Sequence, residues 1–344
     1  MQTVIYDLKT QYDEGMDAAA RAICAGELVA MPTETVYGLA ADAMNADAVA
    51  QIFSVKGRAQ DNPLIVHIDR VESIDEIAYI SPLAEKLTRY WPGPLTMVLK
   101  KREGVIPDVV TCGMDTVAIR LPASEYAREL IRRSGRFIAA PSANISGKPS
   151  PTRAAHVAHD FLEKIPIILD GGECAVGLES TVVAAYGDKP VILRPGGITE
   201  DMIKDAAGCV EISPAVLNGL KEGERAQSPG MKYKHYAPKA RVVIADGDTR
   251  ESILRTIIRL YDESHDDPLI LCGEDVASLL GDRRKRAIGR TPQDIAHHLF
   301  DELRRADDED EKFLILEAVK PQGIGLAVMN RALRAAGFKV IKGD

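Results

Sequence analysis

Residues 137–152 read FIAAPSANISGKPSPT, an apolar stretch followed at once by small polar residues, Pro and Gly. Phe137–Ala140 predicts a buried strand. The loop after it carries hydroxyl and amide side chains, and its turn residues expose backbone N–H groups that can hold phosphate oxygens. It is not a P-loop, because the spacing to Gly-Lys-Ser/Thr is absent. A plain Ser/Pro/Gly loop is the alternative, but the abrupt change from a buried strand favours a ligand site.

Strand and helix patterns alternate on both sides of this stretch, which predicts an α/β or α+β domain with a mixed sheet. The expected helices are Met16–Ala25, ending at Gly26, and Ala46–Val55. The expected strands, apart from the one above, are Leu28–Met31, Leu64–Ile68, Leu95–Leu99, Val117–Leu121, Ile167–Leu169, Thr181–Ala185 and Val191–Leu193.

A second alternation of strands and helices begins after Ala240 and predicts a small parallel α/β domain of Rossmann-like type. Its helix Pro292–Arg305 has Thr291 as the expected N-cap. It has no G-x-G-x-x-G loop, so dinucleotide binding is not indicated. We therefore divide the chain into a domain at 1–205, a linker at 206–240 and a domain at 241–344. The other expected elements here are Val242–Ala245, Glu251–Tyr261, Leu269–Leu271, Phe313–Glu317 and Ile324–Ala336.

Composition places the chain among ordinary globular proteins, with 46% hydrophobic and 27% charged residues over 344 positions. Its formal net charge of −8 disfavours non-specific nucleic-acid binding as the main activity. Charged residues interrupt every apolar stretch before membrane-spanning length. The five cysteines are scattered and never form C-x-x-C, which argues against a disulfide framework and a zinc site. We expect a soluble cytoplasmic protein without a protein-bound metal.

Two further clusters follow strand or helix patterns. PTETVYGL (32–39) puts hydroxyls and a carboxylate after a strand, where they suit a small polar ligand, although an N-capped turn explains them equally well. Lys56 and Arg58 flank Gly57 at a helix end and can grip phosphate. Favourable pairing of basic residues with the helix C-terminus is the simpler reading. His67 alone is more often structural than catalytic.

Two arginines lie in strands that are otherwise apolar. Arg120 is in Val117–Leu121, and Arg194 ends Val191–Leu193. Burying an unpaired arginine is costly, so each must be paired or bind an anion. GLEST (177–181) adds hydroxyls. No Ser/His/Asp or Cys/His arrangement and no H-E-x-x-H spacing is present.

These pieces, in this order, resemble the YrdC-like threonylcarbamoyl-AMP synthases. The SPGMKYKHYAP segment (228–238) and the second α/β domain resemble the longer, two-domain branch of that family. Ala59 stands where the family usually has Pro. The matching motifs are PTETVYGL (32–39), KGR (56–58), DNPLIVHI (61–68), DTVAIRLP (115–122), PSANISGKPSPT (141–152), GLEST (177–181) and LRPG (193–196).

The resemblance implies a YrdC-like domain with a twisted mixed sheet, and a reaction in which threonine, bicarbonate and ATP give threonylcarbamoyl-AMP and pyrophosphate. Other proteins then pass the threonylcarbamoyl group to tRNA. Lys56 and Arg58 are expected to be catalytic. The residues expected around threonine are Thr35, His67, Arg120, Ala140 and Ser180. Those expected to hold ATP are Arg58, Asn62, Thr116, Ser142, Asn144, Ser150 and Arg194.

The chemistry agrees with these residues, because two anions must approach each other and clustered cations lower that barrier. Magnesium is expected with ATP, held mostly by phosphates and water. We hypothesise that 228–238 covers the ATP site as a lid, with His235 and Tyr236 approaching the nucleotide, since an acyl-adenylate is hydrolytically fragile. The alternatives are an RNA-binding module, with tRNA as a weak contact at most, and a carbamoyl-adenylate-forming enzyme.

Overall fold

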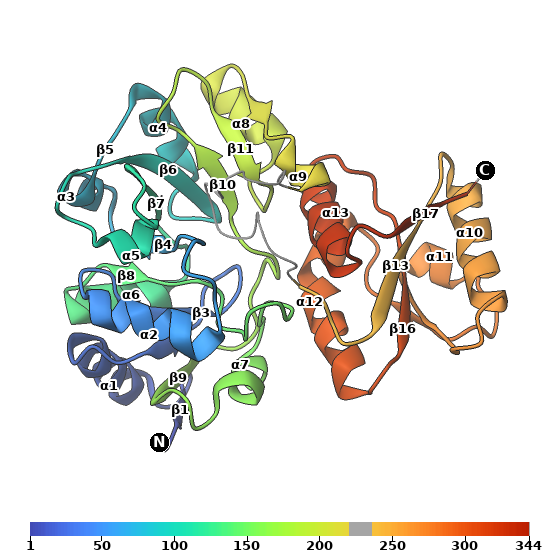
Figure 1. Cartoon of the computed structure of the whole chain (residues 1–344), viewed down its shortest axis with the longest axis horizontal. Coiled ribbons are helices and arrows are strands. Elements are labelled where there is room, and N and C mark those ends of the chain that lie inside the picture. The colour runs from blue at the N-terminus through green and yellow to red at the C-terminus, as the bar shows by residue number, and fades with distance from the viewer. Residues whose placement is uncertain (220–235, 344) are drawn as a thin grey trace. The chain divides into compact units, whose positions relative to one another are not determined.

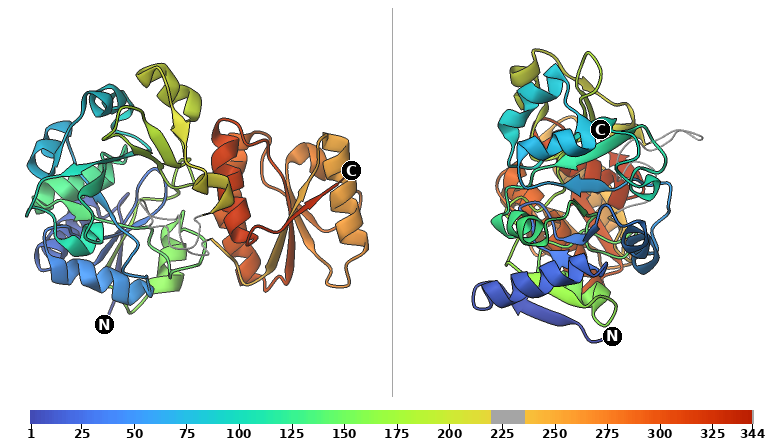
Figure 2. Two further views of the ribbon diagram at one scale, coloured as in Figure 1. Left: turned by 45° about the horizontal axis from the view of Figure 1, so that its top comes forward. Right: turned by 90° about the vertical axis from the view of Figure 1, so that its left-hand side faces the viewer.

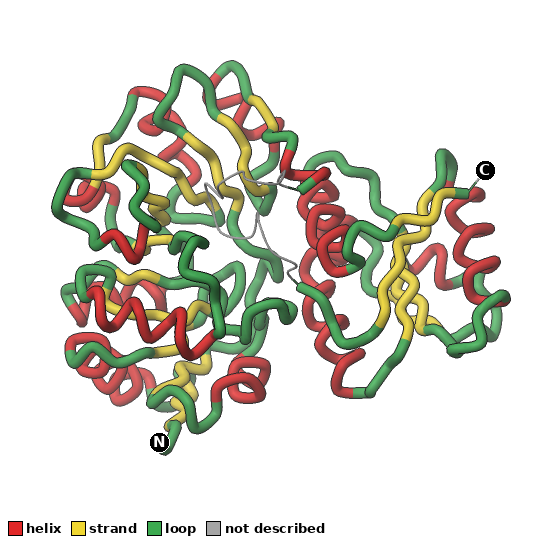
Figure 3. The backbone as a smooth tube through the Cα atoms, in the orientation of Figure 1, coloured by secondary structure: helices red, strands yellow, loops and turns green. Residues whose placement is uncertain are grey.

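The computed structural model describes residues 1–219 and 236–343. These residues divide into two compact units, which are treated separately here. The first unit takes residues 1–146 and 150–219, and the second takes 147–149 and 236–343. Figure 1 labels their helices and strands, and Figure 3 shows that each unit gathers its strands into one sheet flanked by helices.

The first unit is built on a mixed sheet of twelve strands within residues 1–219, in the order β1-β9-β2-β3-β8-β4-β7-β6-β10-β11-β12, with β5 paired to β6. The sheet contains both parallel and antiparallel pairs, and strands distant in sequence become neighbours. The strands are β1 (Val4–Asp7), β2 (Val29–Met31), β3 (Gly38–Asp42), β4 (Ile65–His67), β5 (Ala78–Tyr79), β6 (Leu95–Lys101), β7 (Thr116–Arg120), β8 (Ile138–Ala139), β9 (Ile167–Asp170), β10 (Thr181–Ala184), β11 (Val191–Arg194) and β12 (Glu211–Ile212).

The helices of this unit begin and end where local capping chemistry predicts. The Asn45 side chain accepts hydrogen bonds from Asp47 N and Ala48 N, and the helix that follows ends at Gly57 with φ 59°. Ser124 caps another helix, which ends at Gly135. The α-helices are α1 (Tyr12–Cys24), α2 (Ala46–Lys56), α3 (Ile74–Ile77), α4 (Pro82–Leu87), α5 (Asp108–Thr111), α6 (Glu125–Ser134), α7 (Ala154–Phe161), α8 (Glu200–Ala207) and α9 (Ala215–Asn218).

Apolar clusters on this sheet hold its strands in fixed register. One cluster includes Leu39, Ile52, Val66 and Ile119, all fully buried. Another joins Met16 and Ile23 of α1 to Leu130 of α6 and to strand residues. A fully buried aliphatic side chain contributes about 1.5–3 kcal/mol relative to an exposed one. The sheet is therefore a rigid base for polar groups at the strand ends.

The second unit is a parallel sheet of five strands within residues 236–343, in the order β15-β14-β16-β13-β17. Helices α12 and α13 pack together on one face, and α10 lies on the other (Figure 2). Thr291 caps α12 in a capping box with Asp294, and Pro292 is its first residue, as predicted. The elements are β13 (Arg241–Asp246), α10 (Arg250–Asp262), β14 (Leu269–Cys272), α11 (Glu274–Ala277), β15 (Lys285–Ala287), α12 (Pro292–Asp308), β16 (Phe313–Glu317), α13 (Ile324–Ala335) and β17 (Val340–Lys342).

The predicted fold class, a mixed α/β domain followed by a small parallel one, is confirmed. Two local differences stand out. PTETVYGL was read as a loop, yet β3 starts at its Gly38 and pairs with β2 and β8. Residues 206–219, read as linker, include β12, which pairs with β11, so the first unit continues past 205. None of the described helices combines the length and apolarity needed to cross a membrane.

Candidate active site

A row of polar residues crosses the middle of the large sheet. His67, the last residue of β4, lies opposite Arg120, the last residue of β7, and Arg120 lies opposite Thr96 of β6. All three are buried, with Arg120 4% exposed. The Ser180 hydroxyl, just before β10, is 2.7 Å from the Thr96 hydroxyl. Pairing of four strands therefore brings His67, Arg120 and Ser180 to one place.

Thr35 joins this row through its hydroxyl. Arg120 Nη1 donates to Thr35 Oγ1 at 2.8 Å. Thr33 Oγ1 donates to the Val36 carbonyl at 2.6 Å, so the 2.8 Å contact between the two threonine hydroxyls must be donated by Thr35. The Thr35 hydroxyl proton is thus committed to Thr33. What Thr35 can still offer a ligand is a hydrogen-bond acceptor.

Arg194 lies at the other end of the same cluster. It is 6% exposed, and its guanidinium donates to the Ser180 carbonyl from Nε and to the Ser180 hydroxyl from Nη2, each at 3.1 Å. Two residues later the backbone at Gly196 passes so close to Thr181 that a Cβ would lie 2.3 Å from Thr181 N, and only glycine fits there. Hydrogen bonds therefore connect Arg194 through Ser180 to Thr96, which lies opposite Arg120 in the sheet.

His67 is kept neutral by its surroundings. Burial and the nearby Arg120 charge lower the pKa of His67 to about 3, against a smaller opposing effect from Glu34. Its Nδ1 has no hydrogen-bond partner among the described residues. A neutral imidazole with one unsatisfied nitrogen suits recognition of a polar ligand rather than of an anion by charge.

The lowered pKa of His67 has a measurable effect on stability. The His67 imidazole takes up a proton near pH 6.5 in the unfolded chain and only near pH 3 in the folded chain. As the pH is lowered from 6.5 towards 3, the free energy of unfolding should therefore fall by about 1.4 kcal/mol per pH unit. Denaturant titrations give the free energy of unfolding that each chain loses between pH 7 and pH 5. That loss should be about 2 kcal/mol smaller in His67→Gln than in the unaltered chain. Exposed His159→Gln is the control, and equal losses in all three chains would contradict the assignment.

Lys56, the last residue of α2, connects that helix to the loop that follows Ala140. It is 2% exposed, and its ammonium donates to the Ser142 carbonyl at 2.5 Å and to the Asn144 carbonyl. The Ser142 hydroxyl in turn donates to Asn144 Oδ1 at 2.5 Å, and Ser146 N donates to the Lys56 carbonyl at 2.9 Å. The lysine therefore shapes the loop that carries Ser142 and Asn144.

Arg58 and Asn62 lie together at the turn before β4. The Arg58 guanidinium donates to the carbonyls of Asn62 and Pro63 at 3.0–3.2 Å. Asn62 is 1% exposed, and its Oδ1 has no hydrogen-bond partner among the described residues. Thr116 is the first residue of β7, four residues from Arg120, so about 13 Å of strand separates them. Thr116 is outside the polar row.

Ser150 and Ala140 complete the first unit's share of the predicted site. Ser150 is fully buried, and its hydroxyl donates to Glu179 Oε1. Ala140 N donates to the Ile65 carbonyl at 3.0 Å, and a Cβ at Gly38 would lie 3.2 Å from Ala140 Cβ. Glycine at 38 thus lets β3 approach the chain at Ala140.

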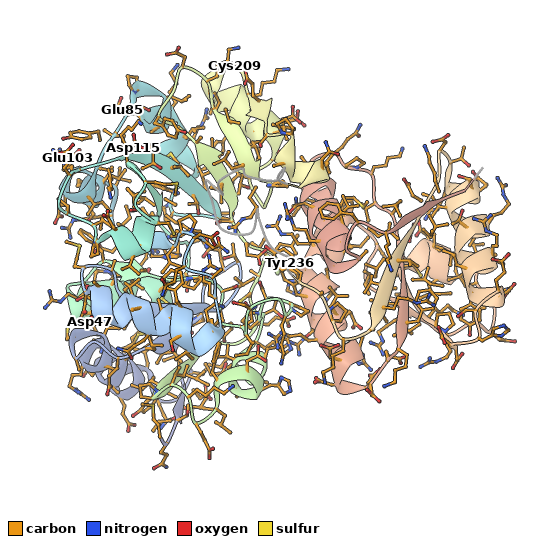
Figure 4. All side chains as sticks on the ribbon, viewed as in Figure 1. Asp47, Glu85, Glu103, Asp115, Cys209 and Tyr236 are labelled. Carbon is orange, nitrogen blue, oxygen red and sulfur yellow. The ribbon has the colours of Figure 1, made fainter. Side chains whose placement is uncertain are left out.

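Tyr236 belongs to the second unit, where it is labelled in Figure 4. It is 5% exposed, its ring centroid lies 5.0 Å from that of Phe300, and the Arg331 guanidinium is 5.8 Å from it. His235, and the stretch 228–235 of the hypothesised lid, lie outside the described residues. The roles assigned to His235 and Tyr236 stay predictions.

Three buried residues of the site are not among those expected from the sequence to bind threonine or ATP: Glu34, Thr96 and Glu179. Each has a signal that could have found it. Thr96 is a hydroxyl in the apolar run LTMVL, and the two glutamates lie inside PTETVYGL and GLEST. Buried carboxylates inside such motifs need a partner, and here those partners are Arg120 and Ser150.

A mixed sheet with buried arginines and hydroxyls at its strand ends, and a hydroxyl-rich loop at residues 141–146, is the arrangement expected of a protein that binds a small polar ligand. Comparison with known proteins is more specific. The family model described as telomere recombination matches residues 21–196, and the one described as threonylcarbamoyl-AMP synthase, C-terminal domain, matches 198–337. The chain belongs to the threonylcarbamoyl-AMP synthases, a family of enzymes, and the predictions of family and enzyme class are confirmed.

Relatives with this activity match the chain from end to end. The threonylcarbamoyl-AMP synthase of Pyrococcus abyssi is 46% identical over 99% of both chains. That of Bacillus subtilis is 42% identical over 96% of this chain and 95% of its own. The crystal structure of the P. abyssi protein Sua5 with L-threonine superimposes with a TM-score of 0.90 at 44% identity, covering 100% of this chain and 99% of that one.

Proposed function

We propose that this chain joins L-threonine, bicarbonate and ATP into threonylcarbamoyl-AMP, with release of pyrophosphate. In this reaction the threonine amine and bicarbonate form a carbamate and water, and a carbamate oxygen attacks the α-phosphorus of ATP. Thr35, His67, Arg120, Ala140 and Ser180 form the threonine pocket. The residues that hold ATP are Arg58, Asn62, Thr116, Ser142, Asn144, Ser150 and Arg194, with His235 and Tyr236 added by the hypothesised lid.

One observation supports the threonine pocket above the others. His67 Nδ1 has no hydrogen-bond partner among the described residues, and nearby the 2.7 Å ion pair between Glu34 Oε1 and Arg120 Nη2 is not aligned as a hydrogen bond. Leaving a buried polar atom unsatisfied costs about 1–3 kcal/mol. Such a cluster is typical of a site whose partner is a ligand with both donors and acceptors. A free amino acid has both, in its carboxylate and its amino group.

The charges suit the proposed reaction. Joining a carbamate to a phosphate brings two anions together, and the chain offers three fixed cations: the buried Arg120 and Arg194, and the half-buried Arg58. Electrostatic stabilisation of this kind needs no covalent protein nucleophile. Arg58 and Lys56 are the proposed catalytic pair, Lys56 acting through the loop that it holds.

Magnesium is proposed to enter with ATP. The oxygens that line the proposed nucleotide loop belong mainly to hydroxyl and amide groups, and the carboxylate of Glu179 already accepts a bond from Ser150. That donor set fits an ion carried by phosphates and water better than one held in a protein cage. When bound, the ion would neutralise charge on the triphosphate.

The product would be passed on in the cytoplasm to proteins that transfer the threonylcarbamoyl group to tRNA. Direct tRNA contact by this chain would be weak, since its net charge is −8. The competing function is an RNA-binding module without catalysis. Salt-dependent RNA binding with no ATP turnover would favour that module over the proposed enzyme.

Pyrophosphate release tests the proposal. The full chain with ATP and magnesium should release pyrophosphate only when both threonine and bicarbonate are present. Arg58→Ala should lower the rate by about 10²-fold, since it removes a fixed cation from the site of charge development. Arg70→Ala, at an arginine whose side chain is 60% exposed, is the matched control and should keep the rate. Release that is indifferent to threonine would overturn the function.

A further inference from the structure

Glu34 forms a buried ion pair with Arg120. Its Oε1 lies 2.7 Å from Arg120 Nη2, and the two side chains are 12% and 5% exposed. Oε2 accepts a hydrogen bond from Ser124 N at 3.3 Å. Burial raises the pKa of Glu34, but the Arg120 charge and hydrogen bonds outweigh it and hold that pKa below its usual value. Glu34 is therefore an anion beside the arginine at neutral pH.

The same turn fixes the orientation of the guanidinium. Arg120 Nε points to the Gly93 carbonyl at 3.4 Å and Nη1 donates to Thr35 Oγ1, while Glu34 lies against Nη2. Three protein acceptors around one planar group leave it little freedom to rotate. Of the three, only Glu34 carries charge. Its contact with Nη2 is close but not aligned as a hydrogen bond, so Nη2 still has donor capacity.

The pair has a net charge of zero, which changes what the pocket attracts. A buried arginine alone would draw in any small anion, because Coulomb attraction is strong where water is excluded. The negative charge of Glu34 largely cancels the attraction that Arg120 would exert on an anion outside the pocket. The pocket then prefers a ligand with two opposite charges over a simple anion: a carboxylate that Arg120 attracts, and a cationic amino group that Glu34 attracts.

We propose that Glu34 is a positioning and selectivity residue: it holds Arg120 in its binding orientation and makes the pocket select an amino acid zwitterion over a simple carboxylate. The inference rests on the proposed function, in which Arg120 binds the threonine carboxylate.

The test compares threonine with 2,3-dihydroxybutanoate, in which a hydroxyl replaces the amino group. The Michaelis constant for threonine and the inhibition constant for the analogue are measured by pyrophosphate release. In Glu34→Gln, the preference for threonine over the analogue should fall at least about tenfold, with the Michaelis constant for ATP within about twofold of the parent value. Glu317→Gln, at a half-buried carboxylate of the second unit, is the control and should leave both unchanged.

Glu34→Asp keeps the charge but shortens the side chain. It should raise the Michaelis constant for threonine several-fold while keeping the preference over the analogue, and it replaces Glu34→Gln as the test if that variant does not fold. Unchanged preference in folded Glu34→Gln, or an unchanged constant in Glu34→Asp, overturns the inference. If the unaltered chain shows no threonine-dependent release, the proposed function has failed instead.

Discussion

Arg120→Ala is expected to reduce threonine-dependent pyrophosphate release by about 10²- to 10³-fold and to destabilise the first unit by about 3–5 kcal/mol. The activity is expected to fall because the variant lacks the buried cation that we propose binds the threonine carboxylate. The stability falls because Glu34 is left as a buried carboxylate without its partner, while Thr35 loses the donor at 2.8 Å. Steady-state kinetics and denaturant unfolding measure the two effects.

The double variant Arg120→Ala with Glu34→Ala separates the two effects. Removing the stranded carboxylate should recover part of the stability but none of the activity, since removing both members of a buried pair costs less than removing one. Arg89→Ala, whose side chain is 59% exposed and 3.7 Å from Asp205, is the control, with an expected change below about 1 kcal/mol. Full stability in Arg120→Ala would show that the pair is not buried as described.

Lys56→Met is expected to lower kcat/KM for ATP by about 10²-fold and the free energy of unfolding by about 2–4 kcal/mol. Methionine keeps an unbranched stem of similar length but leaves the Ser142 and Asn144 carbonyls without the ammonium that both accept from. The loop that carries Ser142 and Asn144 then loses its shape. Kinetics with varied ATP, together with thermal unfolding, check the result.

Threonine binding without ATP distinguishes a local effect from general damage in this variant. The polar row at His67, Arg120 and Thr96 does not involve Lys56, so calorimetry should find threonine affinity within about threefold of the parent value. Lys86→Met, in the surface helix α4, is the matched control. An ATP Michaelis constant unchanged in Lys56→Met would remove the lysine from the nucleotide site.

Most of the fold could be predicted from the sequence, because its strands are short apolar runs bounded by turn residues. Leu64–Ile68 and Val117–Leu121 correspond to β4 and β7, and an arginine in the second of these runs already required a partner. β3 was missed because GLAAD has no β-branched or aromatic residue. It is a strand through its pairing with β2 and β8, which is a tertiary effect.

The site was less accessible to sequence reasoning, because its contacts join residues far apart in the chain. The motifs pointed to Thr35, Arg120 and Ser180, but Thr96 enters only through the pairing of β6 with β7. The same holds for Lys56: two cations beside a glycine suggested a direct grip on phosphate, whereas its ammonium is bonded to loop carbonyls 86 and 88 residues away.

The polar row takes one residue each from β4, β7 and β6, and a fourth from the turn before β10, so no single strand contains it and it exists only when these strands are paired. An amino acid that binds there binds the folded chain and not the unfolded one, in which these strands are separate. Saturating ligand at 100 times its dissociation constant would therefore add about 2.7 kcal/mol to the whole sheet at once. Amide exchange should slow in all of these strands together.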